Sequence, residues 1–246
     1  MAALAVLAVL AAATLAGSGH PTPARAPSGT GGPAGASRAA QAAPPGARTS
    51  SAGAANPNPS AHPITGPTPP PIAAALTLGR ADAPVAMVEF GDYQSTSCGA
   101  FARDTEPVLI RRYVDTGVVR LPWRDFPWVG AQSVRAAVAA RAAGVQGKFW
   151  AYHDYLFAHQ FPDEHSGLVT GAYLRSVARR LGLNMTLFNR DLTNPALTAA
   201  VRADDAFGQQ LGVPGTPAFL IGGRPFFGAQ PLPAFEAAIT QARRGQ

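Results

Sequence analysis

Cysteine is nearly absent from this sequence: Cys98 is the only one among 246 residues, so no disulfide can form within this chain. Lysine is almost as scarce, because Lys148 is the single lysine among 20 basic residues. Acidic residues are missing from the first third of the chain, and all 14 of them lie at Asp82 or later. This change of composition predicts that the folded part begins near Ile72.

The overall charge is basic, with a formal net charge of +6 and an isoelectric point of about 10.2. Three of the positive charges lie before the folded part, as Arg25, Arg38 and Arg48. The remaining basic residues are spread among Asp and Glu and form no run longer than a pair. Such a distribution indicates a solvated surface, and we expect no nucleic-acid partner.

Residues 2–16 form an apolar run made almost wholly of Ala, Leu and Val. The run is short for a membrane span and no basic residue precedes it, but its character is that of an export signal or a membrane anchor, which we assign to residues 1–18. A buried N-terminal helix is the less favoured alternative. The segment predicts a protein on the extracytoplasmic side, either anchored in the membrane or secreted after signal cleavage.

Residues 19–71 consist mainly of Pro, Ala, Gly, Ser and Thr, with almost no large apolar side chain. Such a segment cannot bury enough surface to offset the entropy of ordering, so we expect a disordered linker. A long spacer is most useful when its far end is fixed. We therefore favour a retained membrane anchor over a cleaved signal.

Residues 72–246 show an alternation of strand and helix patterns. A uniformly apolar stretch at 83–90 predicts a strand covered on both faces, and residues 118–123 predict a second, parallel strand. Between them, 96–114 predicts a helix that Pro107 should kink. The remaining elements are five helical patterns, then two short strands joined at Gly222-Gly223, then a closing helix; they fall at 133–143, 149–159, 172–181, 187–192, 196–211, 218–221, 226–227 and 231–244. The order is βαβ, a helical insertion, and ββα, which predicts an α/β fold.

Three strings in this domain resemble the DsbA-like branch of the thioredoxin superfamily. Residues 88–101 (VEFGDYQSTSCGAF) are similar to the family's first strand and active-site turn, and residues 124–127 (RDFP) to the segment after its second strand. Residues 212–223 (GVPGTPAFLIGG) match its cis-proline loop and the hairpin after it. The resemblance implies a thioredoxin fold with a helical insertion, no cofactor, and thiol:disulfide exchange with extracytoplasmic protein or peptide thiols and a membrane redox partner.

The family's Cys-x-x-Cys motif falls on Ser95-Thr96-Ser97-Cys98, so a serine replaces the first cysteine. The hydroxyl of a serine is far less acidic than the thiol of the cysteine that it replaces. We therefore expect Ser95 to cap the helix and not to act as a nucleophile. The resemblance implies that Cys98 is the more buried, resolving thiol. Two interpretations of Cys98 stay open: a small buried apolar residue, or a single thiol that forms mixed disulfides.

Glu89 lies in the first strand, where the resemblance implies an acid that tunes the thiol. A buried carboxylate is costly unless it is hydrogen-bonded or protonated, so Glu89 is a candidate catalytic residue, although pairing with a polar neighbour is an equal alternative. The resemblance implies a cis bond between Thr216 and Pro217 and a peptide-binding surface there, which we extend to Thr96 and Ser97.

His153, His159 and His165 have a spacing that matches no usual metal site, so we expect no metal. The aromatic residues of 123–157 are predicted to pack between the insertion and the sheet. Two functions remain: an exported thiol:disulfide oxidoreductase with Cys98, Ser95 and Glu89 at its centre, and a redox-silent, membrane-tethered domain that binds peptides at the cis-proline loop.

Overall fold

The computed structural model describes residues 67–245. The predicted signal or anchor segment, 1–18, and most of the predicted linker, 19–71, lie outside the described residues. Within 67–245, no helix is both long enough and apolar enough to span a membrane.

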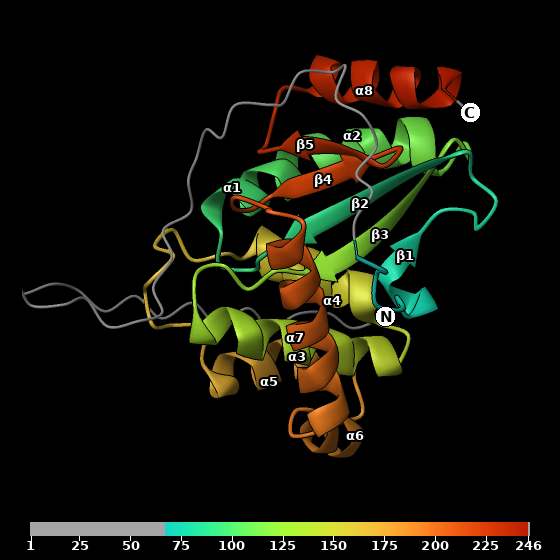
Figure 1. The fold of residues 1–246 in the computed structure, drawn as a ribbon. Helices are drawn as coiled ribbons and strands as arrows, with labels where there is room; N and C mark the ends of the chain where they lie inside the picture. The colour runs from blue at the N-terminus through green and yellow to red at the C-terminus, as the bar shows by residue number, and fades with distance from the viewer. Residues whose placement is uncertain (1–66, 246) are drawn as a thin grey trace, which may run out of the picture. The chain divides into compact units, whose positions relative to one another are not determined.

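A five-stranded sheet with the order β1-β3-β2-β4-β5 forms the centre of the fold (Figure 1). The strands β2 and β3 run parallel, and β4, β5 and β1 join them antiparallel. Their bounds are Thr77–Leu78 (β1), Val85–Gly91 (β2), Val119–Asp125 (β3), Ala218–Ile221 (β4) and Arg224–Phe227 (β5). The predicted α/β fold with βαβ and ββα units is therefore confirmed. The sequence did not predict β1 or the 3₁₀ turn η1 before it (Ala74–Leu76), because elements of two or three residues carry no periodic pattern.

The hairpin between β4 and β5 turns at Gly222 and Gly223, which have φ values of 57° and 77°. Two consecutive positive φ angles are the geometry of the tight hairpin turn expected for this pair. A Cβ atom at Gly222 would lie 2.6 Å from the Cβ of Ala242, so this glycine also permits the close approach of the closing helix α8 (Leu232–Arg244).

Four helical segments follow β2 and join into one run, which we call helix 96–114. The run alternates between α and π geometry, as α1 (Thr96–Ala100), η2 (Phe101–Thr105), α2 (Glu106–Leu109) and η3 (Ile110–Val114). The sequence predicts a kink at Pro107, which has no N–H to donate; the structure has a wide π turn on each side of α2.

The first π turn decides which side chain faces the core. In a regular helix, seven residues make about two turns, so Thr105 would lie below Cys98. The wide turn at η2 adds one residue, and Glu106 lies there instead. Cys98 and Glu106 are accordingly buried, whereas Thr105 is half-buried.

The helical insertion contains all five predicted helices, displaced by no more than two residues at their ends. Their bounds are Ala131–Val145 (α3), Phe149–Ala158 (α4), Gly171–Arg180 (α5), Met185–Asp191 (α6) and Pro195–Gln210 (α7). The side chains of Thr170, Asn184 and Asn194 accept backbone N–H groups at the starts of α5, α6 and α7. These capping residues fix where the helices begin.

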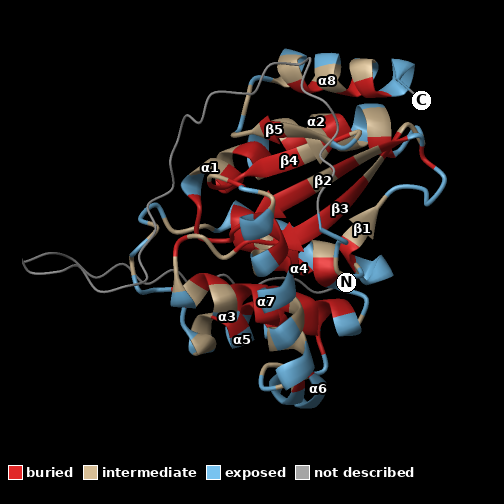
Figure 2. Cartoon of the chain, in the orientation of Figure 1, coloured by how far each residue is buried: buried red, intermediate tan, exposed pale blue. Residues whose placement is uncertain are grey.

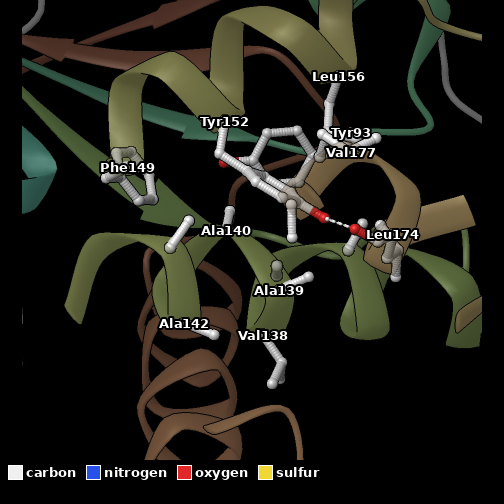
Figure 3. Packing of buried hydrophobic residues seen from close by; sticks show 14 of the residues in the cluster. Tyr93, Val138, Ala139, Ala140, Ala142, Phe149, Tyr152, Leu156, Leu174 and Val177 are labelled. Atoms are coloured by element: carbon white, nitrogen blue, oxygen red, sulfur yellow. Dashed lines mark hydrogen bonds between the residues drawn. The ribbon is translucent and has the colours of Figure 1, made fainter. Parts of the chain in front are cut away.

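The core lies along both faces of β2, β3 and β4 and continues into the insertion, as the burial colours show (Figure 2). Aromatic rings fill the space between the sheet and α4, including Trp123, Phe149 and Phe157, as predicted. Tyr152 projects from α4 toward α5, where its hydroxyl donates to the Leu174 carbonyl at 2.8 Å (Figure 3).

Two buried arginines and two buried aspartates link the sheet to the insertion. Arg124 pairs with Asp204 at 2.5 Å, and Arg141 pairs with both Asp125 and Asp204. The network therefore ties the end of β3 to α3 and α7. Arg124 also donates to the Pro70 carbonyl at 2.6 Å, which fixes the start of the described chain against the domain.

Candidate functional site

The N-terminus of α1 and the loop before β4 meet at Ser95. The Ser95 Oγ accepts the Cys98 backbone N–H at 3.3 Å and lies 3.3 Å from the Thr216 carbonyl oxygen, to which its hydroxyl donates. Ser95 has no exposed surface. The hydroxyl is thus held by both bonds and caps the helix, as the sequence predicts. Because a hydroxyl is far less acidic than a thiol, Ser95 does not supply the nucleophile that a cysteine thiolate would.

Cys98 lies one turn further along α1 and is a free, fully buried thiol. Burial raises its pKa far above the usual value, and the charge of Glu89 acts in the same direction. Cys98 is therefore a protonated thiol across the physiological range, and it reaches a partner only if the turn above it opens.

Thr216 and Pro217 face the turn from the other side. The bond between them is cis, and both residues are buried. The Thr216 hydroxyl has no hydrogen-bond partner within residues 67–245. On the opposite side of this contact, Thr96 is exposed and Ser97 is half-buried, so the turn presents these two residues to solvent.

Glu89 lies in β2 with 1% of its surface exposed, opposite Trp123 of β3. Burial raises the pKa of its carboxyl to about 8, and its Oε2 has no hydrogen-bond partner in the described part of the chain. Glu89 is therefore a neutral acid at pH 7 and does not pair with a polar neighbour through this oxygen.

Residues 160–164 cover the turn, and no pattern in the sequence indicates this. Gln160 Nε2 donates to the carbonyls of Tyr93 and Ser95, at 3.0 and 2.8 Å. The Glu164 carboxylate accepts both the backbone N–H and the hydroxyl of Thr96, at 2.8 and 2.9 Å. A carboxylate of the chain itself therefore occupies the position at which a helix N-terminus favours an anion.

The comparisons with known proteins agree with this geometry. A family model described as thioredoxin matches residues 73–241. The chain belongs to the thioredoxin family. Relatives such as a probable disulfide bond formation protein D of Bacillus anthracis show that it belongs to the DsbA-like branch. This relative is 31% identical over 150 residues, which cover 60% of this chain and 69% of the relative.

Solved structures share the fold. Oxidised BdbD from Bacillus subtilis has a TM-score of 0.64 at 25% identity and covers 69% of this chain and 93% of its own. A thioredoxin-like oxidoreductase from Silicibacter pomeroyi has a TM-score of 0.60 at 32% identity, with 68% and 91% covered. The predicted DsbA-like thioredoxin fold is confirmed.

A second group of relatives carries the domain within much longer proteins. The Na(+)/H(+) antiporter NhaA 1 of Salinispora arenicola is 37% identical over 171 residues, which cover 68% of this chain and 24% of the antiporter. The chain thus spans about a quarter of the length of these relatives.

Proposed function

We propose that this DsbA-like protein binds extended segments of extracytoplasmic proteins at the surface of Thr96, Ser97, Thr216 and Pro217, and does not run a two-cysteine redox cycle. The observation that carries the proposal is the Ser95 hydroxyl, bonded to the Cys98 N–H and the Thr216 carbonyl. It fills the position of the attacking thiol with a group that forms no disulfide. Beside it, Thr216 and Pro217 keep the cis bond, and the buried Thr216 hydroxyl has no hydrogen-bond partner within residues 67–245.

The location is part of the same proposal. Its support is the apolar segment at residues 1–18 and the spacer at 19–71, which favour an anchored protein facing the extracytoplasmic side, with secretion after cleavage as the alternative. Extracytoplasmic proteins or peptides are the expected partners, and their thiols and a redox partner in the membrane belong to the second candidate function below.

Two measurements on the full chain test the binding role. Peptides of about ten residues without cysteine should shift the amide NMR signals of Thr216 and Thr96, equally in wild type and in Cys98→Ser. Insulin reduction and dithiol oxidation should stay at background in both proteins. Insulin reduction that is lost in Cys98→Ser would overturn the proposal.

A second candidate function is exchange through Cys98 alone, and the buried acid Glu89 favours it. Here the Cys98 thiolate attacks a partner disulfide, the new bond is a mixed disulfide, and one partner sulfur leaves as a thiolate that takes a proton from solvent. With no second cysteine in the chain, only a thiol of the partner resolves the mixed disulfide, so the disulfide moves without net oxidation. Trapping of a disulfide-linked partner by wild type but not by Cys98→Ser would establish this route.

A further inference from the structure

A cavity of about 200 Å³ lies beside the turn that leads into α1. Its walls come from residues 129–132, which lead into α3, and from the segment around Glu164, which joins α4 to α5. Gln94 of the turn itself also lines it. Because the Glu164 carboxylate bonds to Thr96, the cavity adjoins the proposed peptide-binding surface.

The charge around the cavity is negative. Glu164 and His165 are the titratable residues that line it, and no Lys or Arg within residues 67–245 does so. Behind the wall, the buried Asp92 accepts the N–H of Val129, a lining residue, at 2.7 Å. Burial raises the pKa of Asp92 to about 6, and the charge of Glu164 acts in the same direction, so Asp92 is largely ionised at pH 7. Two carboxylates therefore favour a cation here.

Glu164 is held in place by the turn. Its Oε1 accepts the backbone N–H and the hydroxyl of Thr96, at 2.8 and 2.9 Å, and its backbone carbonyl accepts Gln94 Nε2 at 2.6 Å. Gln94 is fixed in turn by Ser133, whose hydroxyl donates to the Gln94 Oε1 at 3.0 Å. A partner that pairs with Glu164 therefore meets a charge that is ordered in advance, which lowers the entropic cost of binding.

The rest of the lining carries little side-chain bulk. Gly130, Ala131 and Gly167 all contribute to it, and they leave room for an unbranched apolar stem. The side chains of Lys and Arg combine such a stem with a cationic tip. Small residues beside a fixed carboxylate therefore fit a long basic side chain better than an apolar or an acidic one.

We propose that this cavity is a specificity pocket for a Lys or Arg side chain of the bound peptide, and that Glu164 selects the positive charge. The inference deepens the proposed peptide-binding function and rests on it. A peptide that lies along Thr216 and Thr96 brings a side chain to Glu164, because Glu164 contacts Thr96 directly. The partners are then extended segments with a basic residue, and the same charge disfavours acidic segments.

The test uses the full chain and three peptides of about ten residues without cysteine, which differ only at one central position: Lys, norleucine or Glu. Norleucine keeps the unbranched stem of lysine without its ammonium group, so this pair isolates the effect of the charge. Dissociation constants are measured from the NMR shift of the Thr96 amide. The Lys peptide should bind about fivefold more tightly than the norleucine peptide, on the scale of one partly exposed ion pair, and the Glu peptide should bind most weakly.

Glu164→Gln is the decisive variant, because its amide oxygen can still accept from Thr96 while the charge is gone. This variant should bind the Lys and norleucine peptides equally. Glu236→Gln, the same change on α8, should keep the preference of the wild type for the Lys peptide. High salt should reduce that preference in the wild type, since it screens the charge of Glu164.

Equal binding of the Lys and norleucine peptides to the wild type would overturn the specificity pocket and leave peptide binding standing. A Glu164→Gln protein that binds both peptides more weakly by one common factor would also overturn it, since Glu164 would then only hold the turn. If none of the three peptides shifts the signals of Thr96 or Thr216, the peptide-binding function itself fails, and the specificity pocket falls with it.

Discussion

The hydroxyl of Ser95 lies 3.3 Å from the carbonyl oxygen of Thr216, 121 residues away in the sequence. This bond joins the start of helix 96–114 to the cis-proline loop. It uses the Thr216 backbone carbonyl, so a bound peptide must either share that acceptor or replace Ser95 as its donor. The turn is therefore closed by this weak internal bond together with the bonds from Gln160 and Glu164 that cover it.

Ser95→Cys should create dithiol oxidoreductase activity in a protein that has little. The new thiol would lie at the helix start, three residues before Cys98, where the helix dipole lowers its pKa and a disulfide can form. We expect insulin reduction and a defined reduction potential in this variant. Ser97→Cys is the matched control, since it adds a thiol without the Cys-x-x-Cys spacing. Equal activity in the two variants would contradict the role assigned to position 95.

Glu164→Gln should raise the reactivity of that new thiol. The Glu164 carboxylate bonds to the Thr96 N–H beside it, so it opposes a thiolate there. Removing the charge in the Ser95→Cys protein should lower the thiol pKa by about one unit, measured from the pH dependence of alkylation. Asp163→Asn, an exposed neighbour, should change it much less. An unchanged pKa would mean that solvent screens Glu164 fully.

The sequence predicted most of the fold, because long elements carry a repeating pattern and caps such as Thr170 and Asn194 mark their ends. It predicted the turn and the cis-proline loop through resemblance. It did not predict Gln160 and Glu164, since contacts between a loop and a distant turn leave no local signal. Glu106 was also missed, because regular helical spacing places Thr105 on the buried face.

Asp204→Asn should destabilise the domain strongly. Asp204 pairs with Arg124 and Arg141, and all three side chains are at most 9% exposed, so the change leaves buried guanidinium groups undercompensated. Removing one partner from a buried network costs about 3–5 kcal/mol. Urea unfolding of the full chain measures this loss. Asp82→Asn, which breaks an exposed pair with Arg80, should cost far less, because solvent screens that pair.

Glu89→Gln should make the stability of the domain less sensitive to pH between about 4.5 and about 8. Burial raises the pKa of Glu89 from 4.5 to about 8, so the neutral acid favours the folded state. Its contribution is fully present below pH 4.5, declines as the unfolded chain ionises, and is lost as the pH rises through about 8. An amide does not ionise, so the variant should gain roughly 2–4 kcal/mol on wild type between pH 5 and pH 8, on the scale of 1.36 kcal/mol per pKa unit. Urea unfolding at both pH values measures this gain, with Glu236→Gln as the control that should show none. No difference between the two variants would mean that Glu89 ionises in the folded protein as it does in the unfolded chain.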